Sequence, residues 1–128
     1  MIVADSSAIL EVLLNTSRAA AMRNLLLAEG QTIHVPHLMD VEVLQVLRRY
    51  VRIATLTSAR AREAIEDYSS MRLTRYPHDA LLERIWELRH SFTAYDAAYI
   101  ALAEGLNASL ITCDRALTSG HRAQVVVL

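Results

Sequence analysis

One stretch of the sequence, 93–114, restricts the possible folds more than any other. Residues 93–104 are apolar on nearly every side of a helix, which predicts a helix buried in the core. Thr93 can cap the start of this helix, and Gly105 stands where a helix C-terminus favours a left-handed residue. A short apolar strand over 109–113 follows. A buried helix followed directly by a strand indicates a protein with layers of helices packed on a sheet.

Two carboxylates interrupt this apolar stretch. Asp96 lies in the first turn of the expected helix, and Asp114 ends the strand that follows it. Burying a carboxylate costs free energy unless a partner compensates the charge. Two such residues in one stretch therefore require an explanation beyond the packing of the core.

The rest of the chain alternates between short apolar runs and helical patterns. Strands are expected at 2–4, 33–35, 71–75, 109–113 and 124–127, and helices at 6–14, 18–29, 37–52, 57–69, 77–90 and 93–104. Within these helices we expect Val41, Leu44, Leu82 and Trp86 to face inward. The alternation predicts an α/β fold, a three-layer sandwich with a mainly parallel central sheet and helices on both faces.

Four acidic residues are expected at one edge of this sheet. Asp5 ends the first strand, Glu42 follows the second strand, and Asp96 and Asp114 flank the strand at 109–113. Sites in open parallel sheets form beyond the C-terminal ends of the strands. Four like charges stay close together only with a cation among them, and all-oxygen ligands select Mg²⁺ or Mn²⁺.

Each acid also has a structural interpretation. Asp5 and Asp114 are favoured helix caps, Thr93 with Asp96 matches a capping box, and Glu42 can belong to a solvated stripe. Their joint placement at one edge favours the metal site. Side chains beside them can hydrogen-bond a carboxylate or a water, or only cap and pack: Ser6, Ser7 and Thr112, with Arg115 close by in sequence.

Other candidate ligands are weaker. Asp40 is two residues from Glu42, so a helix turns it to another face, and we interpret it as an acid favoured by the helix dipole. The five histidines show no spacing typical of a metal site, and Cys113 has no nearby histidine to activate it.

The length and composition of the chain limit its domain number, its location and its partners. A chain of 128 residues predicts one domain over 1–128, and no apolar run is long enough to span a bilayer, so no membrane partner is expected. No basic region precedes the first apolar residues, so a signal peptide is not expected. A single cysteine fits a reducing, cytoplasmic location. The net charge of −1 neither demands nor excludes nucleic acid.

Taken together, the segments resemble PIN-domain ribonucleases, and among them the VapC-type toxins of toxin–antitoxin pairs. The similar segments, in order, are IVADSSA at 2–8, VP at 35–36, EVL at 42–44, LRR at 47–49, TAYDAAYIALAE at 93–104 and LITCDRAL at 110–117. The segment at 93–104 is the most specific of these. The resemblance covers essentially the whole chain.

This resemblance implies an activity and partners. Asp5, Glu42, Asp96 and Asp114 would be the acidic quartet that holds Mg²⁺ or Mn²⁺, and RNA phosphodiester bonds would be hydrolysed by a metal-activated water. The implied partners are an RNA substrate, a cognate VapB-type antitoxin, operator DNA reached only through that antitoxin, and a second copy in a homodimer. Asp40 departs from the small residue common before the glutamate, and Leu117 stands where some relatives have a further acid.

Three alternatives remain at this point. A phosphorylatable receiver domain has a similar length and an acidic Mg²⁺ pocket, but such domains need a lysine, and this chain contains none. A metal-free ribonuclease would use histidine and arginine chemistry and would leave the four acids without a role. A catalytically weak PIN-like module would act mainly through antitoxin and operator DNA.

Overall fold

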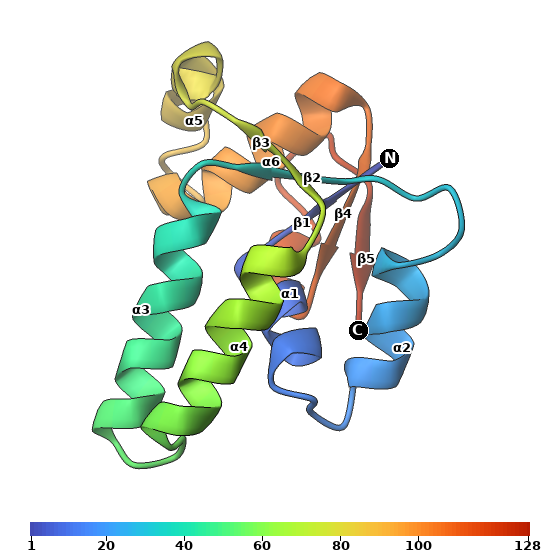
Figure 1. Cartoon of the computed structure of the whole chain (residues 1–128). Helices are drawn as coiled ribbons and strands as arrows, with labels where there is room; N and C mark the ends of the chain where they lie inside the picture. The colour runs from blue at the N-terminus through green and yellow to red at the C-terminus, as the bar shows by residue number, and fades with distance from the viewer.

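The computed structural model describes residues 1–128 and is built around one five-stranded sheet (Figure 1). All strand pairs are parallel, and the order across the sheet is β3-β2-β1-β4-β5. The strands are β1 (Ile2–Ala4), β2 (Ile33–Pro36), β3 (Leu73–Tyr76), β4 (Ser109–Thr112) and β5 (Val125–Val127). The predicted parallel α/β sheet is confirmed.

Helices cover both faces of the sheet, as predicted. They are α1 (Ser6–Leu13), α2 (Ala19–Leu26), α3 (Met39–Arg52), α4 (Ser58–Ser70), α5 (Leu82–Glu87) and α6 (Ala94–Leu106), with short 3-10 turns η1 (Asp79–Leu81) and η2 (Arg115–Leu117). The chain runs outward from β1 to β3 and then returns to β4. Right-handed connections therefore place α1–α4 on one face and α5 and α6 on the other. None of the helices has the length and apolar character that crossing a membrane requires.

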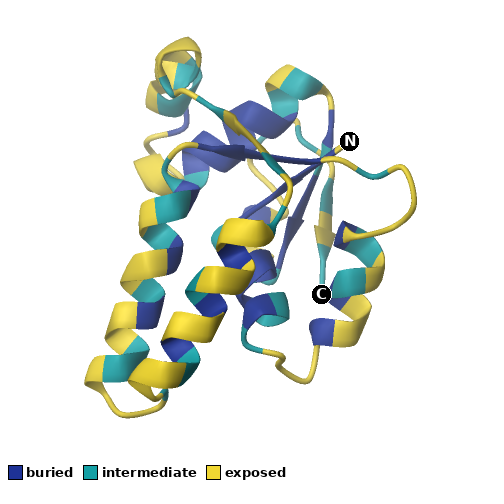
Figure 2. Ribbon diagram, viewed as in Figure 1, coloured by how far each residue is buried: buried dark blue, intermediate teal, exposed yellow.

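Helix α6 forms the centre of the second face. Every residue from Ala97 to Ala103 is buried, and the helix packs against β1, β2 and β4 (Figure 2). Alanine at four of these positions lets the helix backbone approach the sheet closely. The predicted buried helix is confirmed, and Thr93 caps it by accepting a hydrogen bond from the backbone N–H of Asp96.

The end of α6 differs from the prediction. Gly105 lies inside the helix, and the left-handed residue is Asn107, with φ of 50°. Asparagine tolerates this conformation because its short polar side chain can hydrogen-bond locally. The helix therefore continues to Leu106 before the chain turns into β4.

The inward face of α3 was also predicted wrongly. Val41 and Leu44 are 65% and 45% exposed, whereas Met39, Val43 and Leu47 are buried. The buried residues recur every fourth position and form one stripe against the core. Val41 and Leu44 lie on a neighbouring stripe that no part of this chain covers.

The bounds and the inward face of α5 were also predicted wrongly. It is shorter than the predicted 77–90, and Leu82 and Trp86 are 61% and 67% exposed. Leu81, Ile85 and Leu88 pack against the core instead. These three residues recur at spacings of four and three, so they share one side of the helix and turn Leu82 and Trp86 outward.

Candidate metal centre

Four chain segments carry the predicted acids to the C-terminal edge of the sheet. Asp5 follows β1 directly, and Asp114 follows β4 after one residue. Glu42 and Asp96 lie in the first turns of α3 and α6. Because β1 and β4 are adjacent and parallel, their ends meet at the same edge.

Asp5 is the most buried of the four, with 6% of its surface exposed. It accepts hydrogen bonds from the Ser7 hydroxyl at 2.6 Å, from the backbone N–H of Ala8 at 3.1 Å and from the Thr112 hydroxyl. Burial raises the pKa of Asp5; the hydrogen bonds oppose the rise and Asp114 adds to it. Asp5 is therefore both the cap of α1 and a member of the acidic cluster.

Thr112 links the ends of β1 and β4. Its hydroxyl donates to Asp5 and accepts from the backbone N–H of Asp114 at 2.9 Å. The Ser7 hydroxyl in turn accepts from the backbone N–H of Cys113 at 2.9 Å. Asp114 itself is exposed and caps η2 by accepting from the backbone N–H of Ala116. These contacts fix the relative positions of the two strand ends.

Glu42 has a partner that the sequence prediction missed. The phenol of Tyr99 donates a hydrogen bond to Glu42 Oε1 at 2.5 Å. Burial raises the pKa of Glu42, the hydrogen bond from Tyr99 opposes this, and the charges of Asp96 and Asp5 raise it further. Tyr99 follows Asp96 by three residues on one helix, a spacing that places both on the same face and was a usable signal.

The four carboxylates repel one another. Burial raises the pKa of Asp96, and the charges of Asp114 and Asp5 raise it as well. The charges of Asp5, Asp96 and Asp114 thus each raise the pKa of at least one other acid, and no cationic side chain offsets the charge of Asp5, Glu42 or Asp96. The structure brings all four into one electrostatically strained region.

The cluster does not form a ready-made cage, since no group of three or more His, Cys, Asp or Glu side chains is arranged to hold a metal ion. Hydrogen bonds to Ser7, Thr112 and Tyr99 engage Asp5 and Glu42. The donor set nevertheless fits a hard divalent cation, because it consists of carboxylate oxygens that a nearby positive charge would relieve.

Three other residues considered from the sequence lie outside these contacts. Ser6 begins α1, Arg115 begins η2 and is exposed, and neither is hydrogen-bonded to the four acids. Asp40 pairs with Arg75 at 3.0 Å and accepts from the hydroxyl of Tyr68 at 2.6 Å. Asp40 therefore ties α3 to β3 and α4, and it takes no part in the acidic cluster.

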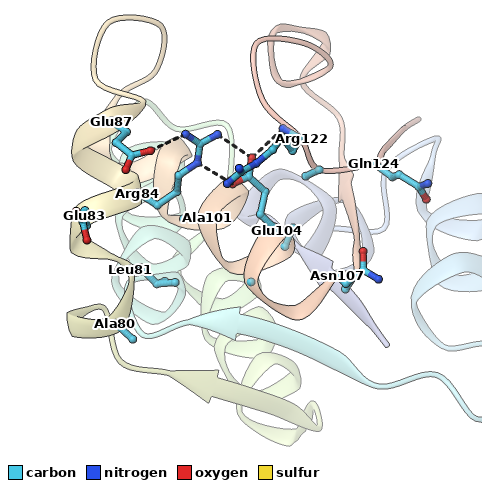
Figure 3. Close-up of a pocket in the computed structure, with 14 residues that line it drawn as sticks. Ala80, Leu81, Glu83, Arg84, Glu87, Ala101, Glu104, Asn107, Arg122 and Gln124 are labelled. Carbon is cyan, nitrogen blue, oxygen red and sulfur yellow. Dashed lines mark hydrogen bonds and ion pairs between the residues drawn. The ribbon is translucent and has the colours of Figure 1, made fainter.

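A cavity of about 690 Å³ lies at the opposite end of α6 (Figure 3). Most of its charged side chains are paired: Arg84 donates to both oxygens of Glu104 at 2.7 and 3.0 Å, and Arg84 also bonds Glu87. Because of these partners, mainly Arg84, the pKa of Glu104 falls to about 2. The cavity contains satisfied ion pairs, and its one unpaired acid, Glu83, is exposed, so we do not regard it as the functional site.

Comparison with known proteins identifies the family. Residues 2–119 match the PIN domain. This chain belongs to the PIN-domain family. The PIN domain is 46% identical over 124 residues to "VapC ribonuclease Mb0985" of Mycobacterium bovis, covering 97% of this chain and 94% of that one. It is 37% identical over 127 residues to "Ribonuclease VapC12" of Mycobacterium tuberculosis, covering 98% and 97%. Within the family it therefore groups with the VapC ribonucleases.

Solved structures agree on the fold. VapBC2 from Rickettsia felis, solved bound to a DNA fragment from its promoter, superimposes with a TM-score of 0.74 at 16% identity over 98% of both chains. VapC20 of Mycobacterium tuberculosis, described as a sarcin–ricin loop cleaving toxin, gives 0.70 at 17% identity over 92% of this chain and 93% of that one. At these identities the likeness supports the architecture alone.

Proposed function

We propose that this PIN domain is a divalent-metal-dependent endoribonuclease and the toxin of a toxin–antitoxin pair. The observation that carries the proposal is the cluster of Asp5, Glu42, Asp96 and Asp114, whose charges oppose one another without a cationic partner. The kinship with proteins named VapC ribonucleases supplies the reaction class.

In the proposed site the four carboxylates hold Mg²⁺ or Mn²⁺. A cation bound there would lower the pKa of a water and offset charge on the phosphate. Three donors hold both oxygens of Asp5, and the cap of η2 holds one oxygen of Asp114 and leaves the other without a hydrogen bond, so both carboxylates are fixed at a rigid sheet edge. Asp96 contributes from the first turn of α6, and Glu42 from α3.

The reaction is hydrolysis of an RNA phosphodiester. Water adds to phosphorus, the bond from phosphorus to the 3′ oxygen breaks, and the 3′ oxygen takes a proton. The products carry a 5′-phosphate and a 3′-hydroxyl. Arg115, exposed beside Asp114, is the cationic side chain we assign to a backbone phosphate of the RNA.

A groove between α3 and α4 is the proposed antitoxin site. Its floor is apolar and its rim carries arginines, and it is lined by Leu44, Leu47, Val51, Ala61, Ile65, Arg48, Arg52 and Arg62. An apolar groove of this kind accepts an amphipathic helix or an extended segment. The arginine rim favours acidic groups on that segment. Operator DNA would be reached through the antitoxin.

The exposed apolar side chains of α3, α5 and α6 support a homodimer. Val41, Leu82, Trp86 and Tyr95 are each more than 60% exposed. Exposed apolar side chains mark an interaction surface where they form a contiguous patch. Light scattering of the purified protein, alone and with its antitoxin, tests this; a monomer in both samples would contradict the proposed dimer.

The test of the activity is RNA cleavage followed by end-group analysis. We expect cleavage with Mg²⁺ or Mn²⁺, no cleavage with EDTA, and 5′-phosphate products. A metal-free ribonuclease would instead use the ribose 2′-hydroxyl and leave a cyclic phosphate, also in EDTA. A protein that binds its antitoxin but cuts no RNA under any metal condition would favour the catalytically weak binding module.

A further inference from the structure

Glu42 differs from Asp5 in how its carboxylate is held. Asp5 has three hydrogen-bond donors, whereas Glu42 has one, the phenol of Tyr99. Glu42 also has a longer side chain with more rotatable bonds, and it is only half-buried. The orientation of its carboxylate therefore depends on a single donor.

Tyr99 can orient the carboxylate of Glu42 because its own side chain is buried and packed on all sides. It is 2% exposed, it lies in the middle of the buried α6, and its hydroxyl also contacts Met39 Sδ at 3.7 Å. The phenol carries its proton at neutral pH and donates it to Glu42 Oε1 at 2.5 Å. A buried tyrosine usually finds one partner for its hydroxyl, and here that partner is an acid of the cluster.

The geometry assigns to Tyr99 the role of a positioning residue for Glu42. The phenol takes up Oε1, and Oε2 receives no hydrogen bond from the protein. Oε2 is thereby left available to a cation, so this inference rests on the proposed function. Helix α6 then serves the site twice, since Asp96 supplies a carboxylate and Tyr99, three residues later, orients a second one.

The chain contains a matched control. Tyr68 is 6% exposed, and its hydroxyl donates to Asp40, the other acid in the first turn of α3, at 2.6 Å. Asp40 is also held by Arg75 and stands outside the cluster. Tyr99→Phe and Tyr68→Phe therefore both remove a phenol oxygen from comparable buried surroundings. Only Tyr99→Phe removes a hydrogen bond to a proposed metal ligand.

The experiment is calorimetric titration of Mn²⁺ into the intact protein and its variants, with cleavage measured across Mn²⁺ concentrations. Loss of an outer partner of a metal-binding carboxylate typically weakens metal affinity 10- to 100-fold. We expect Tyr99→Phe to weaken Mn²⁺ binding at least about tenfold, and Tyr68→Phe to leave it unchanged. Saturating Mn²⁺ should restore most of the cleavage rate of Tyr99→Phe, with KM for RNA unaltered.

A double-mutant cycle tests whether Tyr99 acts through Glu42. In a Glu42→Gln background, Tyr99→Phe should cost no further Mn²⁺ affinity, because residues that act through one contact are not additive. Full additivity, or equal losses for Tyr99→Phe and Tyr68→Phe, would overturn the positioning role. The positioning role would also be overturned if Tyr99→Phe bound Mn²⁺ as tightly as wild type while Asp96→Asn did not bind it. If wild-type protein binds no Mn²⁺, the proposed function itself fails.

Discussion

The two ends of helix α6 carry carboxylates in opposite electrostatic settings. Asp96, in the first turn, faces other acids, and burial together with Asp114 and Asp5 raises its pKa. Glu104, in the last turn, faces Arg84 and the backbone of Arg122, and the pKa of Glu104 falls to about 2. The two residues are about 12 Å apart along one helix axis.

This contrast separates a structural acid, Glu104, from one that we propose to be functional, Asp96. Glu104 is stabilised in the native state, because its partners are already in place. Asp96 is destabilised, because it is partly buried, its neighbours Asp114 and Asp5 have the same sign, and no cationic side chain pairs with it. Strained acids of this kind gather where a protein binds a ligand or performs chemistry.

Replacing Asp96 by Asn should abolish function while preserving the fold. The variant removes the charge and keeps the shape, so RNA cleavage and Mn²⁺ affinity should fall by more than about a hundredfold. Relief of the repulsion should leave the metal-free protein as stable as wild type or more so. Cleavage assays and thermal melts with and without Mn²⁺ measure both effects. A folded variant with full activity would remove Asp96 from the site.

Replacing Glu104 by Gln should have the reverse outcome. The neutral amide leaves Arg84 without its main counter-charge, and we expect a loss of about 2 kcal/mol in the free energy of unfolding. Cleavage should remain within about twofold of wild type, because the site lies at the other end of α6. Glu87→Gln is the control, since Glu87 is exposed and its pair with Arg84 is worth less than about 0.5 kcal/mol. Denaturant unfolding compares the three proteins.

The sequence predicted the positions of the four acids better than the identity of their partners. Asp5 and Asp114 follow strand ends, so topology alone places them at one edge. Tyr99 was missed because the apolar surroundings of α6 explain a tyrosine as core, and only the fold shows its hydroxyl reaching α3. The pairing of Glu104 with Arg84 was missed because it joins two helices through the tertiary packing of α5 onto α6.

The outward faces of α3 and α5 were mispredicted for a related reason. Val41, Leu44, Leu82 and Trp86 are apolar, and apolar character alone suggests burial in the core. The structure leaves them exposed, on stripes next to the buried ones. Sequence periodicity cannot distinguish a side chain that packs in its own core from one available to another chain.

The stability of the metal-free protein should rise as pH falls from neutral toward about 5. The folded pKa values of Asp5, Glu42 and Asp96 lie above their usual values of 3.8, 4.5 and 3.8. As pH falls, the native state therefore takes up protons before the unfolded chain does. The destabilisation that these ionised acids cause in the native state is then lost. The pKa shift of Glu104 has the opposite sign. The stability that Glu104 contributes is complete above pH 4.5 and is lost as pH falls toward about 2.

Thermal melts in EDTA from pH 7.5 to 5 measure this effect, and the expected rise is on the order of a few degrees. Asp96→Asn should show a smaller rise than wild type, because one strained acid is gone. Glu104→Gln should show the same rise as wild type, since Glu104 stays ionised throughout this range. A melting temperature that falls steadily across the range in wild type would mean that the acids of the cluster are not strained.

Replacing Arg122 by Ala should have the smallest effect. Its guanidinium is 77% exposed and lies 3.5 Å from Glu104, an arrangement worth at most about 0.5 kcal/mol. The stronger contact of Arg122 is its backbone N–H, which donates to Glu104 Oε1 at 2.8 Å and survives the substitution. Arg84→Ala, which removes two charge-assisted bonds to Glu104, should therefore destabilise far more than Arg122→Ala in denaturant unfolding. Equal losses in the free energy of unfolding for the two variants would show that the general positive field of the region stabilises Glu104. The bidentate pair with Arg84 would then not be what distinguishes this end of α6 from the other.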